Sequence, residues 1–219
     1  MLNELDKALE RRGLPFVRYV DDSMIFCKSK RAARRVKESI TKFIEKTLYL
    51  KVNKEKTVVS YVRGVKYLGY SFYVMKGKCQ FTVHPKSKSK MKSKLKELTS
   101  RSNGWGYAKR KQKLREYIRG WVGYYHLVDM KRLLLETDEW LRRRIRMCIW
   151  KAWKKPKTKV ANLIKCGIDK NLAYQWGLTR KGYWRIADSP ILKRAIDSDS
   201  LHKAGYATMM GSYLEWYPK

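Results

Sequence analysis

The chain is poor in acidic residues. Its 219 residues include 19 Asp or Glu against 52 Lys or Arg, which gives a formal charge of +33. Repulsion among these positive charges destabilises a compact fold, so we expect the protein to bind a polyanion. This argues against a generic metabolic enzyme. Nucleic acid is the first candidate partner, and an anionic membrane surface is the second.

Cysteine and histidine are also scarce. The cysteines lie far apart and form no C-x-x-C pair, and His84, His126 and His202 are not spaced to complete a zinc site. This pattern excludes a zinc finger or a nuclease built on a zinc scaffold. We expect the cysteines to be reduced and mostly buried: Cys27, Cys79, Cys148 and Cys166.

Long apolar runs are absent. No run reaches the roughly 18 residues of a membrane span, and the first residues lack the basic and then apolar order of a signal peptide. We therefore expect a cytoplasmic protein with no membrane partner. The 44% hydrophobic and 13% aromatic content is too high for a disordered basic tail, so the chain can build a core.

Residues 1–84 have the pattern of an α+β fold. Helical spacing of apolar residues predicts helices, and short β-rich runs bounded by Gly, Pro or Asp predict strands and hairpins. The helices are expected at 2–12 and 30–50, and the strands at 16–20, 23–27, 57–62, 65–72 and in a hairpin over 74–83 that turns at 76–78.

The composition changes at Pro85. Residues 86–166 contain no convincing strand, show three helical stripes and hold 25 Lys or Arg against 6 Asp or Glu. The predicted fold is therefore α+β: an antiparallel sheet with helices, followed by an all-α bundle. The predicted parts are 1–84, a helical domain over 85–166 and a basic nucleic-acid-binding tail over 167–219.

Two adjacent carboxylates, Asp21 and Asp22, lie between the strands predicted at 16–20 and 23–27. On a strand they would point to opposite faces, but at a turn they can converge. Hard oxygen ligands suit Mg²⁺, whose remaining ligands are water and phosphate oxygens. A solvated turn is the alternative, because Asp is a favoured turn residue.

The helical region carries three basic clusters. Lys occupies every second position from Lys86 to Lys96, Arg142–Arg144 is followed by Arg146, and Lys154, Lys155 and Lys157 surround a proline. Contacts to a phosphate backbone explain all three, and a solvated face is the alternative. Trp105, in a glycine-flanked loop, is the candidate for base stacking.

Several blocks, in order along the chain, together resemble one family. The run FVRYVDD over 16–22 resembles the palm motif of group II intron reverse transcriptases, whose usual form is Tyr-Ala-Asp-Asp, with Val20 in place of Ala. The segments 50–57 and 65–72 resemble the next blocks of that family. Segments 114–125 and 140–154 resemble its maturase-specific thumb, or X domain, and the end 179–184 is similar to bacterial members without an endonuclease domain.

The resemblance implies a reverse transcriptase and maturase that binds its own intron RNA, aids splicing and supports retromobility. Asp21 and Asp22 would be the catalytic metal ligands for Mg²⁺, and Gly69 would lie near the primer strand. The implied partners are group II intron RNA and an RNA–DNA duplex or DNA target. The nucleic-acid-binding candidates are Tyr19, Gly69, Lys86, Lys90, Lys94, Arg119, Arg142, Arg143, Arg146, Lys154, Lys155 and Lys157.

One departure from the family concerns the start of the chain. Residues 2–12 already resemble mid-palm sequence, so the family's fingers and an earlier metal-binding Asp are expected to be absent. We therefore expect Mg²⁺ only in a complete palm, and no polymerisation by this chain alone unless a fingers-containing chain joins it. The alternatives are a non-catalytic RNA-binding maturase module and a protein that binds any polyanion.

Overall fold

The computed structural model describes residues 2–217 and divides the chain into two compact units, the first ending at His84 and the second beginning at Pro85. Pro85 is the first residue of a helix, where its missing N–H costs no hydrogen bond. The division coincides with the change in composition at that proline.

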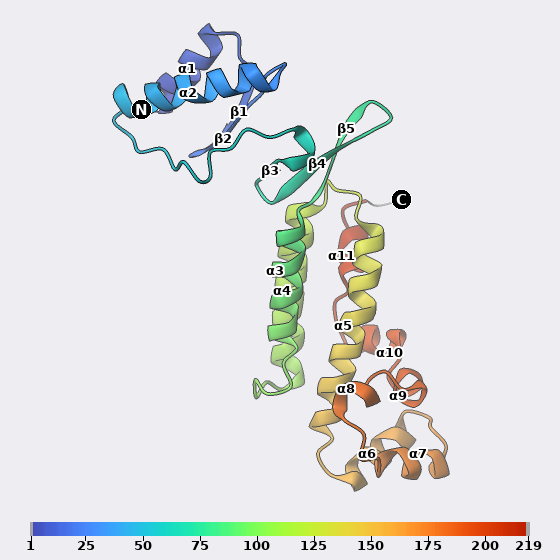
Figure 1. The fold of residues 1–219 in the computed structure, drawn as a ribbon. Coiled ribbons are helices and arrows are strands. Elements are labelled where there is room, and N and C mark those ends of the chain that lie inside the picture. The colour runs from blue at the N-terminus through green and yellow to red at the C-terminus, as the bar shows by residue number, and fades with distance from the viewer. Residues whose placement is uncertain (1, 218–219) are drawn as a thin grey trace. The chain divides into compact units, whose positions relative to one another are not determined.

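The first unit combines helices with two small antiparallel sheets, ordered β1-β2 and β3-β4-β5 (Figure 1), which agrees with the α+β prediction. Its elements are α1 (Leu2–Arg11), β1 (Phe16–Tyr19), β2 (Asp22–Ile25), α2 (Lys30–Lys46), a 3₁₀ turn (Val62–Gly64), β3 (Lys66–Tyr67), β4 (Tyr70–Met75) and β5 (Lys78–Val83).

The core of the first unit lies between its helices and the β1–β2 hairpin. Leu5 and Leu9 of α1 are buried together with Ile40 and Leu48, and Phe16 packs against them. Helix α2 begins at Ser29, whose hydroxyl accepts a hydrogen bond from the Ala32 N–H at 3.1 Å.

Three elements of the first unit differ from the sequence prediction. The strand predicted over 65–72 is interrupted, since β3 ends at Tyr67, Leu68 and Gly69 have positive φ, and β4 begins at Tyr70. Helix α2 ends at Lys46 rather than near residue 50, yet Leu48 is still buried because the chain folds back after the helix. The strand predicted over 57–62 is wrong. No neighbouring strand pairs with residues 57–61 within the described chain, and Val58 and Tyr61 remain 71% and 76% exposed.

The hairpin predicted over 74–83 is confirmed. Strands β4 and β5 pair from Tyr70↔Val83 to Met75↔Lys78. Lys76 and Gly77 form the two-residue turn with φ of +50° and +73°. Such paired positive φ values match the right-handed twist of the flanking strands.

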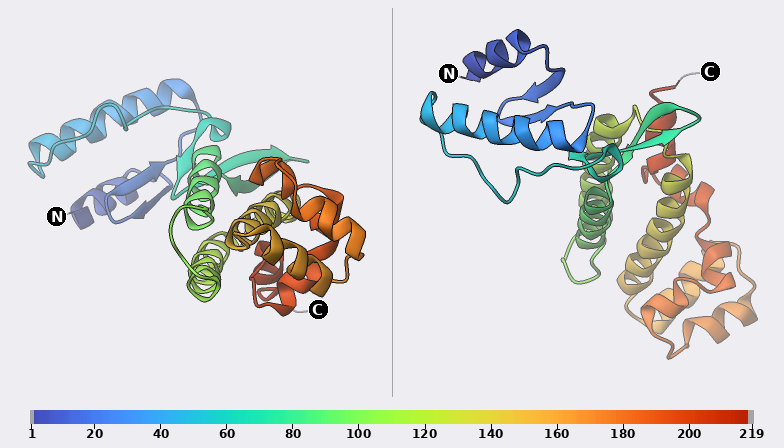
Figure 2. Two further views of the ribbon diagram at one scale, coloured as in Figure 1. Left: turned by 90° about the horizontal axis from the view of Figure 1, so that it is seen from below. Right: turned by 45° about the horizontal axis from the view of Figure 1, so that its top comes forward.

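The second unit is a bundle of helices. In Figures 1 and 2, α3 and α4 run side by side, α5 lies next to α3, and α11 packs along α4 and α5. The helices are α3 (Pro85–Leu98), α4 (Tyr107–Tyr125), α5 (Lys131–Ala152), α6 (Pro156–Lys165), α7 (Lys170–Gly177), α8 (Tyr183–Ile186), α9 (Pro190–Ala195), α10 (Ser198–Lys203) and α11 (Met209–Leu214).

The bundle core follows the predicted helical stripes. Met91 and Leu95 of α3, Leu114 and Ile118 of α4, and Ile145 of α5 are at most 2% exposed. The spacing of four residues on α3 and on α4 places each pair on one helix face. Residues 167–217 fold into the same compact unit, and the Tyr213 hydroxyl donates to the Val128 carbonyl at 3.0 Å.

The cysteine prediction is wrong in part. Cys148 is buried, but Cys79 and Cys166 are exposed and Cys27 is half-buried. Cys79 lies near the turn of the β4–β5 hairpin, opposite Val74, which is also exposed. Across residues 2–217, no helix combines the length and apolar character that a bilayer crossing requires.

Candidate functional site: a carboxylate turn and a basic helical surface

A tight turn carries the two carboxylates of the first unit. Tyr19 pairs with Asp22 across the β1–β2 ladder, so Val20 and Asp21 form the turn itself. Asp21, Asp22 and Tyr19 are exposed. Val20 has a φ of +55°, which is rare for a β-branched residue. The turn thus presents two neighbouring carboxylates to solvent.

Arg18 ties this turn to helix α1. Its Nε donates to the Asp6 Oδ1 at 2.8 Å, its Nη2 donates to the other Asp6 oxygen, and its Nη1 donates to the Val20 carbonyl at 2.8 Å. The hydrogen bond to Arg18 holds the pKa of Asp6 below its ordinary value and raises the pKa of Arg18. Asp6 therefore positions the turn through Arg18.

Tyr67 of β3 faces the same region. Its hydroxyl is buried and has no hydrogen-bond partner within the described residues. Burial raises the pKa of Tyr67, and the negative charge of Asp22 raises it further. After Tyr67, Leu68 and Gly69 turn the chain with positive φ, and the Gly69 carbonyl accepts from the His84 N–H at 3.0 Å. This is the turn that the family resemblance would place near a primer strand.

The carboxylate turn fits a divalent cation in the chemistry of its donors. Mg²⁺ is commonly held by one or two carboxylates together with water and phosphate oxygens. Asp21 and Asp22 supply two carboxylates, and residues 2–217 contain no group of three or more His, Cys, Asp or Glu side chains placed to hold a metal ion. Further ligands would have to be oxygens from outside these side chains.

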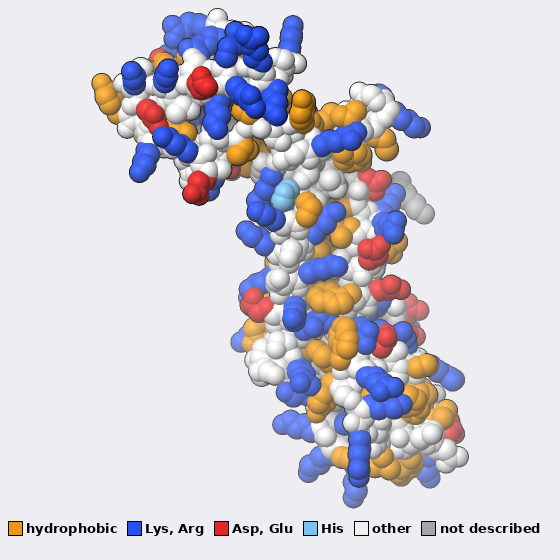
Figure 3. All heavy atoms as spheres, in the orientation of Figure 1, with side chains coloured by type: hydrophobic (Ala, Val, Ile, Leu, Met, Phe, Trp, Pro, Cys, Tyr) orange, Lys and Arg blue, Asp and Glu red, His pale blue; other side chains and the backbone are white. Residues whose placement is uncertain are grey.

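On the face drawn in Figure 3, basic side chains are spread over both units and the few acidic ones are scattered. On α3, the predicted contacts Lys86, Lys90 and Lys94 lie at intervals of four residues and are exposed. Lys94 forms an ion pair with Glu97 at 2.7 Å. The three lysines thus form one exposed helix face.

A second basic group lies where α5 passes into α6. Lys154, Lys155 and Lys157 are all exposed and form no ion pair within the described residues. Pro156, between Lys155 and Lys157, is the first residue of α6. Arg119 of α4 is likewise exposed. These cations are available to phosphate.

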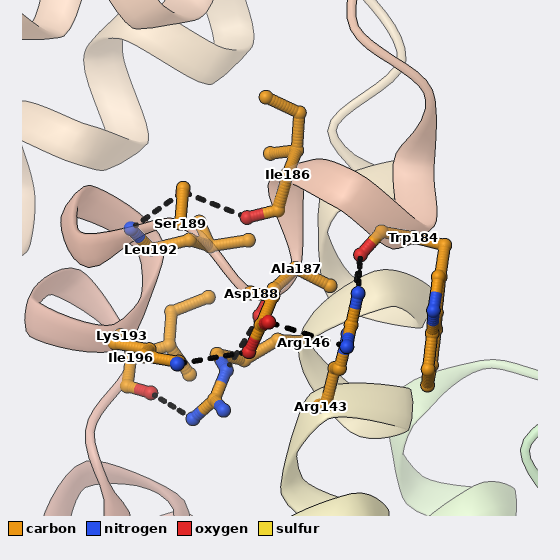
Figure 4. Close-up of polar contacts among 10 residues, drawn as sticks. All are labelled: Arg143, Arg146, Trp184, Ile186, Ala187, Asp188, Ser189, Leu192, Lys193 and Ile196. Carbon is orange, nitrogen blue, oxygen red and sulfur yellow. Dashed lines mark hydrogen bonds and ion pairs between the residues drawn. The ribbon is translucent and has the colours of Figure 1, made fainter.

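The arginines of α5 separate into different roles. Arg142 is half-buried. Arg146 is only 6% exposed, and its guanidinium donates to the carbonyls of Ala187 and Ile196 at 3.0 and 3.4 Å (Figure 4). The prediction that Arg146 contacts nucleic acid is therefore withdrawn, because its donors hold the chain around α8 and α9 against α5.

Arg143 is also engaged within the protein. It donates to the Trp184 carbonyl at 3.0 Å, pairs with Asp188 at 3.2 Å, and its guanidinium carbon lies 3.9 Å from the centre of the Trp184 ring. As Figure 4 shows, the guanidinium and the indole lie side by side. The Arg143 guanidinium is thus engaged by groups of this chain.

Trp105, the predicted stacking residue, is half-buried in the α3–α4 loop. Its backbone N–H donates to the Asn103 side chain at 3.2 Å, and Arg110 donates to the same oxygen at 3.0 Å. Lys109 lies over the indole, 5.5 Å from the ring centre. The loop therefore holds Trp105 in a defined orientation with one face near a cation.

The sequence pattern did not assign a role at the carboxylate turn to Asp6, Arg18 or Tyr67. These residues belong to β1, β3 and α1, which are separate in sequence. The only local signal for the contact between Arg18 and the turn is that Arg18 and Val20 are two residues apart in sequence.

Comparisons with known proteins match both units. Residues 1–72 match the family model of the reverse transcriptase (RNA-dependent DNA polymerase). Residues 88–167 match that of the group II intron maturase-specific domain. A search of curated proteins gave no match. The two matched segments lie on opposite sides of Pro85, so each falls within one compact unit.

Proposed function

Because this chain belongs to the group II intron reverse transcriptases, whose members also carry a maturase-specific domain, we propose that its second unit binds intron RNA and helps that RNA to fold and splice. One observation carries the proposal. The exposed lysines at the α5–α6 junction have no acidic partner among the described residues, while the buried Arg144 and Arg146 of α5 bind carbonyls of neighbouring segments.

The exposed lysines of the second unit are expected to determine its affinity for RNA. Lys154, Lys155 and Lys157 can each neutralise a phosphate and release counterions, which gives affinity without sequence preference. The face formed by Lys86, Lys90 and Lys94 adds a row of charges along α3. Recognition of intron RNA over other polyanions then depends on the shape of the helical bundle.

We propose that the first unit is part of the palm of an RNA-directed DNA polymerase. Asp21 and Asp22 would hold Mg²⁺ there, with the missing ligands supplied by phosphate, water and a further carboxylate of a complete palm. A cation at this turn would let nucleotide phosphate approach the carboxylates. Tyr19 and the Leu68–Gly69 turn would lie against an RNA–DNA duplex or a DNA target, and a fingers-containing chain is a candidate partner. We expect the protein in the cytoplasm with its intron ribonucleoprotein.

The first test is binding of the full chain to a group II intron RNA across a salt series, with tRNA and duplex DNA as competitors. The proposal expects binding that survives both competitors at moderate salt. Equal displacement by every polyanion, with a steep dependence on salt, would instead identify a protein that reads only charge.

The second test separates polymerase from RNA-binding module. Template-dependent dNTP incorporation is measured with Mg²⁺ for the chain alone and with a fingers-containing chain. We expect incorporation only in the second case and its loss in Asp21→Asn. If Asp21→Asn leaves selective RNA binding and splicing unchanged, and no combination incorporates dNTPs, the chain acts as a non-catalytic maturase module.

A further inference from the structure

Trp184 lies at the surface on the short helix α8 of the second unit. The helix buries Ile186, which is 1% exposed, and leaves Trp184 39% exposed. The neighbouring Ala187 is fully buried. The helix is therefore fixed by its inner side chains, and the indole is not needed to fill the core.

The indole is nevertheless held in one orientation. The Arg143 guanidinium covers one face, with its carbon 3.9 Å from the ring centre, and the same guanidinium is bound to the Trp184 carbonyl. Asp188 holds Arg143 from another side at 3.2 Å and is itself bound by Lys193 at 2.8 Å (Figure 4). The ring thus has a fixed cation on one face and retains exposed area.

Arg146 supports this arrangement from within the protein. Its guanidinium donates to the carbonyl of Ala187, the residue next to Asp188, and to that of Ile196. Because Arg146 is buried, these hydrogen bonds are shielded from water and hold the segment firmly on α5. The segment that carries the exposed Trp184 ring is therefore held rigidly against α5.

Exposed cations precede and follow Trp184 in sequence: Arg180, Lys181 and Arg185. The Lys181 Nζ lies over the Trp176 ring, 5.0 Å from its centre. The adjacent Tyr183 has the Arg101 guanidinium 4.9 Å from its ring centre. A ligand that combines a flat ring with negative charge on both sides would satisfy the indole and these cations together.

We infer that Trp184 is a stacking site for an unpaired nucleobase, with Arg180, Lys181 and Arg185 binding the flanking phosphates. The inference rests on the proposed nucleic-acid function and names a site for it. Every nucleobase has a π-face, so stacking of this kind tolerates any sequence but requires an unpaired base. Pre-orientation of the ring by Arg143 lowers the entropic cost of binding.

The test compares the full-length wild type with Trp184→Ala, Trp184→Phe and the control Trp216→Ala. Trp216 is 52% exposed and stacked on His126, with ring centres 4.4 Å apart, but its neighbour is Glu215 instead of a cluster of cations. Binding is measured to a short unstructured oligoribonucleotide, its deoxy counterpart, an abasic version of the same length and a duplex. Circular dichroism checks the fold of each variant.

We expect Trp184→Ala to weaken single-strand binding about five- to hundredfold, with an unchanged salt slope because no charge is removed. Trp184→Phe should retain most of the affinity, and Trp216→Ala should match the wild type. Binding to the abasic strand and the duplex should not respond to Trp184→Ala. A larger effect on the ribo or the deoxy strand identifies which nucleic acid occupies the site.

A second measurement needs no variant. Oligonucleotides containing 5-iodouracil are photocrosslinked to the wild-type chain, and peptide mass spectrometry should map the crosslink to Trp184. Equal loss of binding in Trp184→Ala and Trp216→Ala, or no crosslink at Trp184 from a bound oligonucleotide, overturns the stacking site alone. A wild-type chain that binds none of the nucleic acids overturns the proposed function and the site with it.

Discussion

The Asp6 carboxylate receives two hydrogen bonds from the Arg18 guanidinium, one of them at 2.8 Å, and the same guanidinium reaches the carbonyl of Val20. Helix α1 is thereby connected to the turn that carries Asp21 and Asp22. A planar guanidinium is required for this geometry, because a lysine ammonium cannot bridge a carboxylate and a carbonyl in the same plane.

We predict that Asp6→Asn lowers the melting temperature of the first unit and changes its pH dependence. Because Arg18 lowers the pKa of Asp6 below 3.8, the pair stabilises the fold fully above that value, and the stability is lost as pH falls through the folded pKa. The difference between wild type and Asp6→Asn should therefore vanish in acid. Thermal unfolding across pH measures it.

The matched control is Glu4→Gln on the same helix. Glu4 pairs with Lys7 at 3.0 Å, but both side chains are more than half exposed. Such surface pairs contribute little. An equal drop in melting temperature in the two variants would contradict a specific role for Asp6.

Arg144 provides a test of stability separate from binding. It is 9% exposed, and it donates to the Thr99 hydroxyl at 2.6 Å and to the carbonyls of Lys96 and Thr99 at 3.0 Å each. Arg144→Ala should cost about 2–4 kcal/mol in the free energy of unfolding, since it leaves buried acceptors unpaired. Chemical denaturation measures this. Unchanged stability would mean that these groups are solvated.

The lysines at the α5–α6 junction should behave in the opposite way. Replacing Lys154, Lys155 and Lys157 by Gln should leave the unfolding free energy nearly unchanged, because all three are exposed. The slope of log affinity for RNA against log salt should become shallower by about 2–3, roughly one for each phosphate that is no longer neutralised. An unchanged slope would show that these lysines do not contact phosphate.

The contrast between these cations shows how far the sequence could predict the site. Charge density along the chain drew attention to the region of α3 to α6, and helical stripes identified Leu95, Ile118 and Ile145 as core. Counting charge cannot tell Arg146 from Lys155, however. Arg146 is buried by residues about 40–50 positions later in sequence, whose carbonyls accept its hydrogen bonds.

Elements that depend on residues close in sequence could be predicted, and elements that depend on residues distant in sequence could not. The hairpin at Lys76–Gly77 follows from turn chemistry, and α2 follows from its apolar stripe. The segment 57–61 has strand-like composition, but β propensity acts only with a neighbouring strand, which the described chain does not provide. The composition of one segment does not reveal whether a neighbouring strand is present to pair with it.

Asp138 should couple stability to pH with the opposite sign from Asp6. Its two carboxylate oxygens accept from the N–H groups of Met209 and Met210 at 2.8 and 2.9 Å, yet burial raises the pKa of Asp138. The folded state therefore binds a proton that the unfolded state has released, so this residue's contribution falls as pH rises from 3.8 to the folded pKa.

Asp138→Asn should remove that decline and also weaken one of the two hydrogen bonds to α11, at a cost of about 1–3 kcal/mol near neutral pH. Unfolding of the second unit is followed by denaturant titration at several pH values. The control is Glu139→Gln, the exposed next residue of α5, for which no comparable loss is expected. Similar behaviour of both variants would rule out the buried contact as the cause.

The carboxylate turn itself carries backbone strain. Val20 adopts a φ of +55°, and a β-branched residue in this conformation is strained by roughly 1–3 kcal/mol. Asn tolerates the left-handed region, and Val20 is 65% exposed, so Val20→Asn sacrifices little packing. The carbonyl that Arg18 binds belongs to the backbone and is retained. We expect Val20→Asn to raise the free energy of unfolding of the first unit by about 1 kcal/mol.

The comparison for Val20→Asn is Gly77→Ala in the β4–β5 hairpin, where the change runs in the reverse direction. Gly77 has a φ of +73°, and a Cβ added there would meet open space, so the substitution adds backbone strain alone and stability should fall. Thermal unfolding of both variants tests the pair. A loss of stability in Val20→Asn would show that the valine side chain, and not relief of its strain, decides the turn, because the backbone contact to Arg18 is the same in both proteins.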